Sequence, residues 1–321
     1  MQIRLAQLNY HIGNFEQNVR KIVGEIKIAK ADRVELIVFS ELSVCGYPPR
    51  DFLEFEDFIS KCEDSIAEIA SHCIGITAIV GAPLRNTSVN GKSLFNAAFV
   101  LENGVVKNMV RKSLLPNYDI FDEYRYFEPN RDFDIVEING VRVALTICED
   151  LWNIEDPLYI TNPMDELMEQ NPQLMINIAA SPFDFNHRED RIRVLSANCN
   201  KYGLPLLYVN HVGAQTELIF DGGSMAIDST GKLLHELEYY KEDKASFEYN
   251  KGLKLVSGEP RFDTRLKIER IHDALVLGVA EYFEKLGFNK AVLGLSGGID
   301  SAVVLYLAVE ALGKENVRTL L

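Results

Sequence analysis

Four polar residues each follow a short apolar stretch that is expected to form a β-strand. The stretches are ELIVFS, VVKNMVR, VRVALTI and LMINIAA, and the residues are Glu41, Lys112, Cys148 and Ser181. In an α/β sheet, residues at the carboxyl ends of strands converge on one crevice, where ligands bind. Taken singly, such a cysteine is more often a small buried hydrophobe, and a lone Lys or Glu is more often a solvated charge. The flanking residues must therefore decide between chemistry and packing.

The sequences around three of these residues are far more specific than the residues alone. The first segment, residues 39–48, contains FSEL followed by GYP. The second, residues 111–127, contains RK followed by LLPNY, FDE and RYF, and the third is ICEDLW at 147–152. Over about residues 1–255 these motifs resemble the nitrilase superfamily of carbon-nitrogen hydrolases. The second and third are similar in particular to the glutaminase domains of the glutamine-dependent NAD synthetase family. The resemblance implies an α/β fold, the α-β-β-α sandwich, with a Glu-Lys-Cys triad.

The residue types of the triad suit the hydrolysis of a carboxamide. A cysteine thiolate is a strong nucleophile when a base or a nearby positive charge supplies it at neutral pH. Glu41 would take the thiol proton and return it to the leaving ammonia. Lys112 would stabilise the oxyanion, together with the backbone N–H of Glu149. Glutamine would become a γ-glutamyl thioester on Cys148, from which water releases glutamate.

The same resemblance implies further residues of a glutamine pocket. They would contact the substrate, line the pocket or place a carboxylate near the lysine: Tyr47, Tyr118, Glu123, Trp152 and Ser181. Simple packing is the alternative interpretation, and it is strongest for Tyr47 and Trp152.

Recognition of the glutamine α-carboxylate needs a fixed cation or several N–H donors. Family glutaminases often carry Gly-Lys-Arg after the serine, whereas this chain reads SPFDFNHRED, with His187 in place of the lysine. His187 and Arg188 are the candidates, and Arg191 follows at helical spacing. A surface charge is the alternative for both arginines, and it is favoured for Arg191.

A second motif, LGLSGGIDS at 293–301, follows a predicted strand and opens a predicted helix. Glycines let backbone N–H groups approach a phosphate, and a helix N-terminus adds positive potential. It is not a Walker A loop, because no Gly-Lys-Ser/Thr follows. It resembles the ATP-pyrophosphatase loop of NAD, GMP and asparagine synthetases. By that resemblance Asp300 would help to hold Mg²⁺, and the phosphate-binding residues would be Ser296, Gly297, Gly298 and Ser301.

Together the motifs imply a glutaminase joined to an ATP-dependent synthetase. The substrates would be glutamine, deamido-NAD and ATP, with ATP and Mg²⁺ needed only by the synthetase and no cofactor by the glutaminase. Two alternatives stay open. A free-standing amidase or carbamoylase of the nitrilase superfamily would have no use for SGGIDS, and a non-catalytic scaffold would tolerate the loss of a triad residue.

The pattern of apolar residues predicts the elements that position these motifs. A helix capped by Asn14 is expected between strands at 2–9 and 35–40. Turn dipeptides predict hairpins at Asn103-Gly104, Asn139-Gly140, Asp221-Gly222 and Thr230-Gly231. Further elements are expected as strands at 174–179 and 205–210 and helices at 188–202 and 266–286.

A change in composition at SGEPRFD predicts a domain boundary. We expect a glutamine amidohydrolase domain at 1–256, a linker at 257–264, and the start of a synthetase domain at 265–321. The last segment reads as the first β-α unit of a Rossmann-like domain, which cannot bury both faces of its sheet. Its apolar faces would then pack on a neighbouring chain, so a homo-oligomer is expected.

Composition excludes several classes of protein. The 321 residues are 47% hydrophobic and 25% charged, as in ordinary folded proteins. The 33 Lys and Arg against 47 Asp and Glu give a net charge of −14, which disfavours nucleic acid and membranes as partners. Five scattered cysteines support neither a disulfide framework nor a zinc site. With no signal peptide or long apolar run, a cytoplasmic location is expected.

Overall fold

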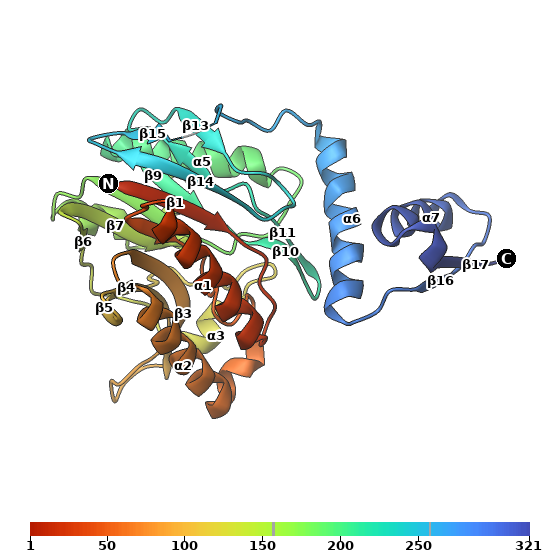
Figure 1. Cartoon of the computed structure of the whole chain (residues 1–321), viewed down its shortest axis with the longest axis horizontal. Coiled ribbons are helices and arrows are strands. Elements are labelled where there is room, and N and C mark those ends of the chain that lie inside the picture. The colour runs from red at the N-terminus through yellow and green to blue at the C-terminus, as the bar shows by residue number, and fades with distance from the viewer. Residues whose placement is uncertain (156–157, 257) are drawn as a thin grey trace.

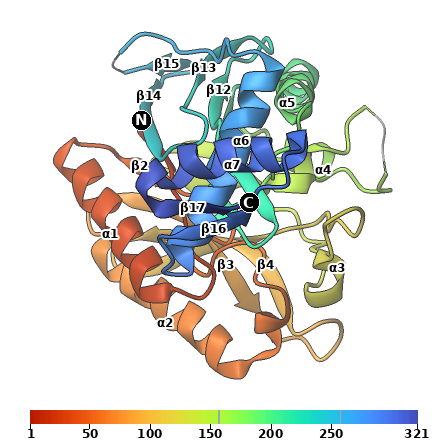
Figure 2. The same ribbon diagram turned by 90° about the vertical axis from the view of Figure 1, so that its right-hand side faces the viewer.

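The computed structural model describes residues 1–155, 158–256 and 258–321. Figure 1 shows two parts, a layered body formed by most of the chain and a smaller C-terminal extension at its right. Figure 2 views the molecule from the side of this extension, which lies in front of the body.

The first sheet of the body is built mainly by the N-terminal third of the chain. Its strands are β1 (Gln2–Gln7), β2 (Leu36–Val38), β3 (Thr77–Arg85), β4 (Leu94–Glu102), β5 (Val105–Arg111), β14 (Asp243–Tyr249) and β15 (Leu253–Leu255). Within the described residues their spatial order is β15-β14-β1-β2-β3-β4-β5. β1, β2 and β3 run parallel, and β4, β5, β14 and β15 each pair antiparallel. The sheet is therefore mixed, as its hairpin dipeptides predict.

The second sheet follows in the middle of the chain. Its strands are β6 (Val136–Ile138), β7 (Val141–Ile147), β8 (Leu174–Ile178), β9 (Leu206–Val209), β12 (Met225–Ile227) and β13 (Leu233–Glu236). Their order in the described part of the chain is β13-β12-β9-β8-β7-β6. β7, β8 and β9 are parallel, so their carboxyl ends meet at one edge.

Helices cover the outer faces of both sheets. They are α1 (Phe15–Ala31), α2 (Glu56–His72), α3 (Glu123–Tyr126), α4 (Pro163–Met168) and α5 (His187–Tyr202), with short 3₁₀ turns η1 (Arg50–Glu54) and η2 (Cys148–Leu151). α1 begins after Asn14, whose side chain accepts from the backbone N–H of Gln17 at 3.2 Å. This confirms the predicted cap.

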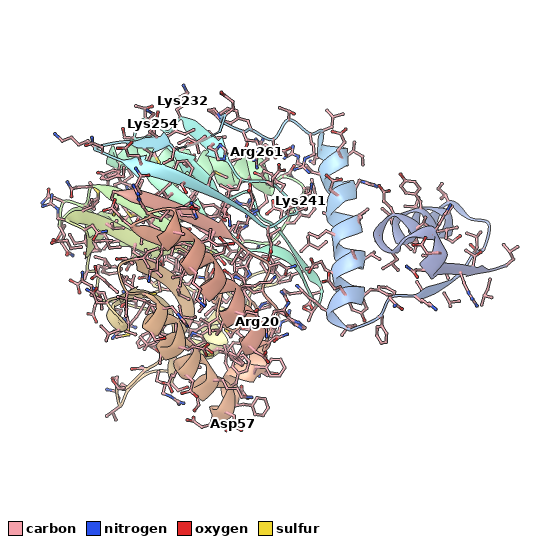
Figure 3. The ribbon with its side chains drawn as sticks, in the orientation of Figure 1. Arg20, Asp57, Lys232, Lys241, Lys254 and Arg261 are labelled. Carbon is pink, nitrogen blue, oxygen red and sulfur yellow. The ribbon has the colours of Figure 1, made fainter. Side chains whose placement is uncertain are left out.

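The two sheets pack face to face around the largest hydrophobic cluster. Ile3 and Leu5 of β1 and Ile79 of β3 lie in this cluster with Leu145 and Ile176 of the second sheet. The alternate strand positions point outward, where they meet the apolar sides of α1 and α2. This alternation with period two is what separates an inner from an outer face of each strand. The predicted α-β-β-α sandwich is thus confirmed, and Figure 3 shows charged side chains such as Arg20 and Asp57 at its periphery.

Three of the four predicted hairpin turns are confirmed. Asn103 and Gly104 have φ of 53° and 83°, and Asn139 and Gly140 have φ of 50° and 77°, as such turns require. The Thr230-Gly231 turn joins β12 and β13.

The hairpin predicted at Asp221-Gly222 is wrong. The nearby hairpin consists of β10 (Val212–Gln215) and β11 (Leu218–Asp221), and it turns one element earlier, at Thr216. Asp221 ends β11, and its carboxylate accepts from the buried Arg191 at 3.0 Å. Gly222 lies against the Gln7 side chain, where a Cβ would clash. The Asp221-Gly222 dipeptide therefore lies in a closely packed segment and does not form a hairpin turn.

The C-terminal extension begins with α6 (Lys267–Lys285), followed by β16 (Ala291–Gly294), α7 (Ile299–Leu312), η3 (Lys314–Asn316) and β17 (Val317–Leu320). β16 and β17 are parallel, as expected of a β-α-β unit. Apolar side chains of this unit, including Val292, Ile299, Val303 and Tyr306, are exposed. Their packing on a neighbouring chain stays a prediction.

Between β15 and α6 the described residues 258–266 form neither helix nor strand. Ser257, the first residue of the predicted linker, lies outside the described residues. The proposed boundaries at 256 and 265 stay predictions. None of the helices in the described ranges combines the length and the apolar character needed to cross a lipid bilayer.

Gly81 of β3 is the point at which the first sheet touches the segment that follows β2. A Cβ at Gly81 would lie 2.7 Å from the carbonyl oxygen of Ser40 and 2.8 Å from the carbonyl carbon of Glu41. Because both obstacles are backbone atoms, we expect Gly81→Ala to lower the free energy of unfolding by about 1–3 kcal/mol, measured by urea denaturation.

The matched control is Gly24→Ala in α1, where a Cβ has nothing within 4 Å. That change should stabilise the helix by up to about 1 kcal/mol, because alanine has the higher helix propensity. Equal effects of the two substitutions would contradict the close approach at Gly81.

Candidate active site

Glu41, Lys112 and Glu123 form one buried network at the carboxyl ends of β2 and β5. Nζ of Lys112 donates to Oε1 of Glu41 at 2.7 Å and to Oε1 of Glu123 at 2.8 Å. The side chains of Glu41 and Lys112 are both 0% exposed. The structure thus brings Glu41 of the first motif together with Lys112 and Glu123, which both belong to the second motif.

The two carboxylates keep the buried lysine charged. Burial alone would lower the pKa of Lys112, but the charges of Glu123 and Glu41 outweigh it and raise that pKa well above its usual range. Burial also raises the pKa of Glu123, and the lysine opposes the rise. Lys112 is therefore a fixed cation and not a base at neutral pH.

Neighbouring side chains and backbone groups satisfy the remaining carboxylate oxygens. Asn96 Nδ2 donates to Glu41 at 2.7 Å and to Glu123 at 3.4 Å, and the Tyr47 hydroxyl donates to Glu123 at 2.8 Å. The backbone N–H of Ala180 donates to the second oxygen of Glu41 at 2.8 Å. Each carboxylate therefore has one orientation.

His211 and Asn96 support this network and were not predicted from the sequence. Nε2 of His211 lies 2.6 Å from the carbonyl oxygen of Glu41, and burial lowers the pKa of its imidazole to about 4. His211 follows the strand sequence LPLLYVN, so it has the same strand-end position as the triad residues. Asn96 is a polar residue inside the largely apolar strand β4. That pattern in the sequence could have identified it as a candidate site residue.

Cys148 lies where β7 ends and η2 begins. Its φ of 45° is in the left-handed region, which residues other than glycine rarely adopt. Burial and the charge of Glu41 raise the pKa of its thiol, while Lys112 opposes the rise. The resting cysteine is therefore a thiol, and it needs a base to become a nucleophile.

Asp150 ties the cysteine turn to the segment that carries Lys112. Its Oδ1 accepts from the backbone N–H groups of Ser113 and Leu114, both at 2.9 Å, and its Oδ2 accepts from that of Ile147 at 3.0 Å. Burial raises the pKa of Asp150 to about 7, against the effect of these donors. The aspartate of ICEDLW thus holds the segments of Lys112 and Cys148 in register, a role that the motif alone did not indicate.

A cleft of about 260 Å³ opens beside the cysteine turn and is lined in part by Tyr118, Glu149, Trp152, Tyr159 and His187. The hydroxyls of Tyr118 and Tyr159 donate to the Glu149 carboxylate at 3.0 Å and 3.2 Å. Burial raises the pKa of Glu149. A buried carboxylate at a cleft suits a cationic ligand group, so the Glu149 side chain adds a candidate that the sequence did not suggest.

Ser181 and His187 form a pair at the same cleft. Ser181 Oγ lies 2.8 Å from Nε2 of His187, and the Ser181 backbone N–H donates to Asn210 at 2.8 Å. The His187 ring packs on Trp152 with their centroids 5.0 Å apart. Burial, helped by the Arg191 charge, lowers the pKa of His187 to about 3. His187 is therefore neutral near pH 7, and only its Nδ1 is left to face a ligand.

The two arginines of the predicted carboxylate site have other partners. Arg188 donates from Nε and Nη2 to the carboxylate of Glu236 at 3.0 Å and 2.6 Å, so its role in substrate binding stays a prediction. The interpretation of Arg191 as a surface charge is wrong, because its side chain is 0% exposed and paired with Asp221. Helical spacing predicts the face of α5 on which Arg191 lies. It does not predict that β11 places Asp221 opposite that face.

The predicted phosphate loop lies between β16 and α7, as strand, loop and helix. Gly297 has φ of 81°, and the Gly298 N–H donates to Ser296 Oγ at 3.3 Å. Ser301 Oγ donates to the Gly298 carbonyl at 3.0 Å, and Asp300 stands in the first turn of α7. Residues 296–298 of the loop are exposed, and the two glycines leave the backbone N–H groups accessible, which fits a phosphate. Among the described residues no group of three His, Cys, Asp or Glu side chains could hold a metal, so Mg²⁺ at Asp300 stays a prediction.

Comparison with known proteins gives two family matches. The carbon-nitrogen hydrolase family matches residues 2–246, and the NAD synthase family matches residues 271–321. The glutamine-dependent NAD(+) synthetase of Synechocystis sp. is 40% identical over 328 residues, which cover 98% of this chain and 58% of that protein. The chain thus spans little more than half the length of such curated relatives.

Solved structures resemble the chain in the same way. The glutamine-dependent NAD+ synthetase of Acinetobacter baumannii, in complex with ADP, matches with a TM-score of 0.88 at 33% identity over 99% of this chain and 58% of that chain. The NitN amidase from Neterenkonia sp. AN1 matches with a TM-score of 0.66 at 21% identity, over 78% of this chain and 93% of that chain. At 21% identity, the match to the amidase shows a shared fold and nothing more.

The charges around Cys148 predict how its thiol titrates. Because the Glu41 carboxylate raises the pKa of this thiol, Glu41→Gln should lower it and move thiolate formation to a lower pH. The measurement is the thiolate absorbance as a function of pH, taken as the difference from Cys148→Ser in the same background. An unchanged or higher titration midpoint in Glu41→Gln would contradict this arrangement of charges.

Proposed function

The chain belongs to the carbon-nitrogen hydrolase family, and we propose that it hydrolyses glutamine as the ammonia-producing part of a glutamine-dependent NAD synthetase. The observation that carries the proposal is the buried Glu41–Lys112–Glu123 network beside the strand-end Cys148. The match of residues 271–321 to the NAD synthase family favours this function over a free-standing amidase, which would not need that segment.

The first half of the reaction forms a thioester. Glu41 accepts the proton of the Cys148 thiol as the sulfur attacks the amide carbon of glutamine. The negative charge that develops on the amide oxygen is stabilised by Lys112 and by the backbone N–H of Glu149. Glu41 then gives its proton to the amide nitrogen, the C–N bond breaks, and ammonia leaves.

The second half regenerates the enzyme. Glu41 takes a proton from water as the water oxygen attacks the thioester carbon, and Lys112 stabilises the oxyanion again. The C–S bond breaks, the cysteine sulfur takes the proton from Glu41, and glutamate leaves. The sum is glutamine and water giving glutamate, ammonia and one proton, which the new γ-carboxylic acid releases, with no net change of protonation in the enzyme. Lys112 stays protonated throughout, as its raised pKa requires.

The cleft offers partners for the two charged groups that distinguish glutamine from a simple amide. The Glu149 carboxylate suits the α-ammonium group, with Tyr118 beside it. The Ser181–His187 pair offers one donor to the α-carboxylate, the Ser181 hydroxyl or the Nδ1–H of His187, depending on which of the two donates to the other. Tyr47 acts indirectly, because its hydroxyl donates a hydrogen bond to the Glu123 carboxylate and orients it.

The ammonia would serve an ATP-dependent amidation of deamido-NAD to NAD. Ser296, Gly297, Gly298 and Ser301 would hold ATP phosphates and Asp300 would help to hold Mg²⁺, which would neutralise phosphate charge. The ADP in the Acinetobacter baumannii structure supports nucleotide binding in this family. A cytoplasmic, homo-oligomeric protein fits this proposal.

Removal of the nucleophile tests the proposed glutaminase. Cys148→Ala should abolish glutamate release from glutamine, and Lys112→Met should lower kcat by about 10²–10³-fold, because an oxyanion donor is lost. Release is measured by coupled glutamate assay, with circular dichroism as a check of folding. Cys199→Ala is the control, because this cysteine is buried in α5 and should leave turnover intact. Normal turnover by Cys148→Ala would contradict the proposal.

The state of His187 makes a second prediction. His187→Ala should raise KM for glutamine several-fold with a smaller effect on kcat, because a binding contact is shared by ground and transition states. Since its pKa is lowered to about 3, His187 gains no proton as the pH falls from about 8 to about 6. The ratio of the KM values of His187→Ala and wild type should therefore stay constant over that range. A ratio that changes near the pKa of free histidine would show that His187 binds as a cation.

A further inference from the structure

We propose that the segment joining the two family matches positions the glutamine pocket through the first turn of α5, and that Arg188 and Arg270 are positioning residues for His187. This inference rests on the proposed function. The contacts that carry it are here called the α5 clamp. They join residues at the start of α5 to a second group from the end of β13, the linker and the start of α6. The groups are Asn186, Arg188 and Glu189, and Glu236, Asp263, Lys267 and Arg270.

Two side chains of α6 hold the residues on either side of His187. Nζ of Lys267 donates to Oδ1 of Asn186 at 2.6 Å, and Nη2 of Arg270 donates to Oε1 of Glu189 at 2.7 Å. The Lys267 ammonium also lies 4.0 Å from the centroid of the Phe185 ring. Residues 185–189 are thus held by α6 at positions before and after the pocket histidine.

Arg188 makes the buried part of the α5 clamp. Its two hydrogen bonds to Glu236 are bidentate, and the Glu236 side chain is 1% exposed. The other hydrogen bonds of Glu236 come from the Tyr239 hydroxyl at 2.7 Å and the backbone N–H of Asp263 at 2.9 Å. A bidentate, charge-assisted pair in a dry site fixes geometry far better than a surface ion pair. Arg188 therefore connects the turn that carries His187 to the backbone of the linker.

The start of α5 depends on these contacts because it lacks an ordinary cap. Asn186 is the N-cap residue, yet its side chain makes no capping hydrogen bond. Its Oδ1, which would normally accept from an N–H of the first turn, accepts from Lys267 instead. The first helical residue is His187 itself, so the position of this turn decides where the imidazole meets Ser181.

The other end of α6 is anchored to the body of the molecule. Glu281 accepts from Asn9 Nδ2 at 2.6 Å, and Lys285 donates to the Ala214 carbonyl at 2.6 Å. Figure 1 shows α6 standing between the body and the β16–α7 unit. Because α6 is one rigid helix that bears on α5 and leads to the predicted phosphate loop, displacement of α6 would be transmitted to the pocket histidine.

A double-mutant cycle on the whole chain tests the α5 clamp. Arg270→Gln and Glu189→Gln should each raise KM for glutamine by about three- to tenfold while kcat changes by less than about twofold. Both substitutions remove the hydrogen bond between Arg270 and Glu189, so the double variant should raise KM by clearly less than the product of the two single effects. The product is the right reference because Arg270 also lies 3.8 Å from Asp263 and Glu189 lies 3.7 Å from Arg188. The rate of Cys148 alkylation by iodoacetamide should stay unchanged, because the triad is untouched.

Glu236→Gln separates positioning by Arg188 from direct binding of substrate. Glu236 holds Arg188 but does not line the cleft, so positioning predicts a raised KM. An Arg188 that binds the α-carboxylate directly would be released by this change, and KM would then stay constant or fall. The matched control is Lys201→Ala, which breaks an ion pair with Asp165 at the opposite end of α5 and should leave KM unchanged.

Amide hydrogen exchange of residues 184–190 gives a readout that does not depend on turnover. Exchange there should be faster in Arg270→Gln than in wild type and unchanged in Lys201→Ala. Wild-type exchange in Arg270→Gln, or a wild-type KM in both Arg270→Gln and Glu236→Gln, would overturn the α5 clamp. A wild-type chain that releases no glutamate from glutamine would instead contradict the proposed function, and the exchange measurement would still decide the α5 clamp.

Discussion

The site depends on one requirement, that the ammonium of Lys112 be paired inside a dry interior. A buried charge without partners costs many kcal/mol, so its surroundings must supply opposite charge and hydrogen bonds at fixed positions. Glu41 after β2 and Glu123 at the start of α3 supply the charge, and Asn96 on β4 orients both carboxylates. Three strands and a helix must therefore meet at one edge of the first sheet. The close approach of backbones at Gly81 is part of the same requirement.

This network also keeps the Cys148 thiol, the proposed nucleophile, protonated in the resting protein. Two carboxylates and one ammonium leave the interior with an excess of negative charge, which together with burial raises the pKa of Cys148. In the proposed mechanism the thiol is thus unreactive in the absence of substrate. When an amide binds, the developing oxyanion would interact with the Lys112 charge as Glu41 receives the proton. Electrostatic stabilisation of this kind acts in the transition state rather than in the resting enzyme.

The sequence predicted the sandwich and the placement of Glu41, Lys112 and Cys148 at strand ends because both follow from local patterns of strand periodicity. The catalytic roles of these residues stay predictions. The sequence did not predict partners that come from distant strands. Arg191 is buried only because β11 brings Asp221 to it, and the turn expected at Asp221-Gly222 is absent for the same reason. Asn96 and His211 were overlooked because a single polar residue in or after an apolar strand does not show which carboxylate or carbonyl it will meet.

Arg188 shows most clearly where adjacency in sequence misleads. Consecutive residues of a helix point about 100° apart, so His187 and Arg188 at the start of α5 point in different directions. His187 faces the cleft and contacts Ser181, whereas Arg188 faces Glu236 and the linker. The substitution of histidine for the lysine that family glutaminases often carry removes that cation, and Arg193, the arginine that lines the cleft, is paired with Glu155 and Asp190. The first turn of α5 thus borders the candidate cleft on one side and contacts β13 and α6 on the other.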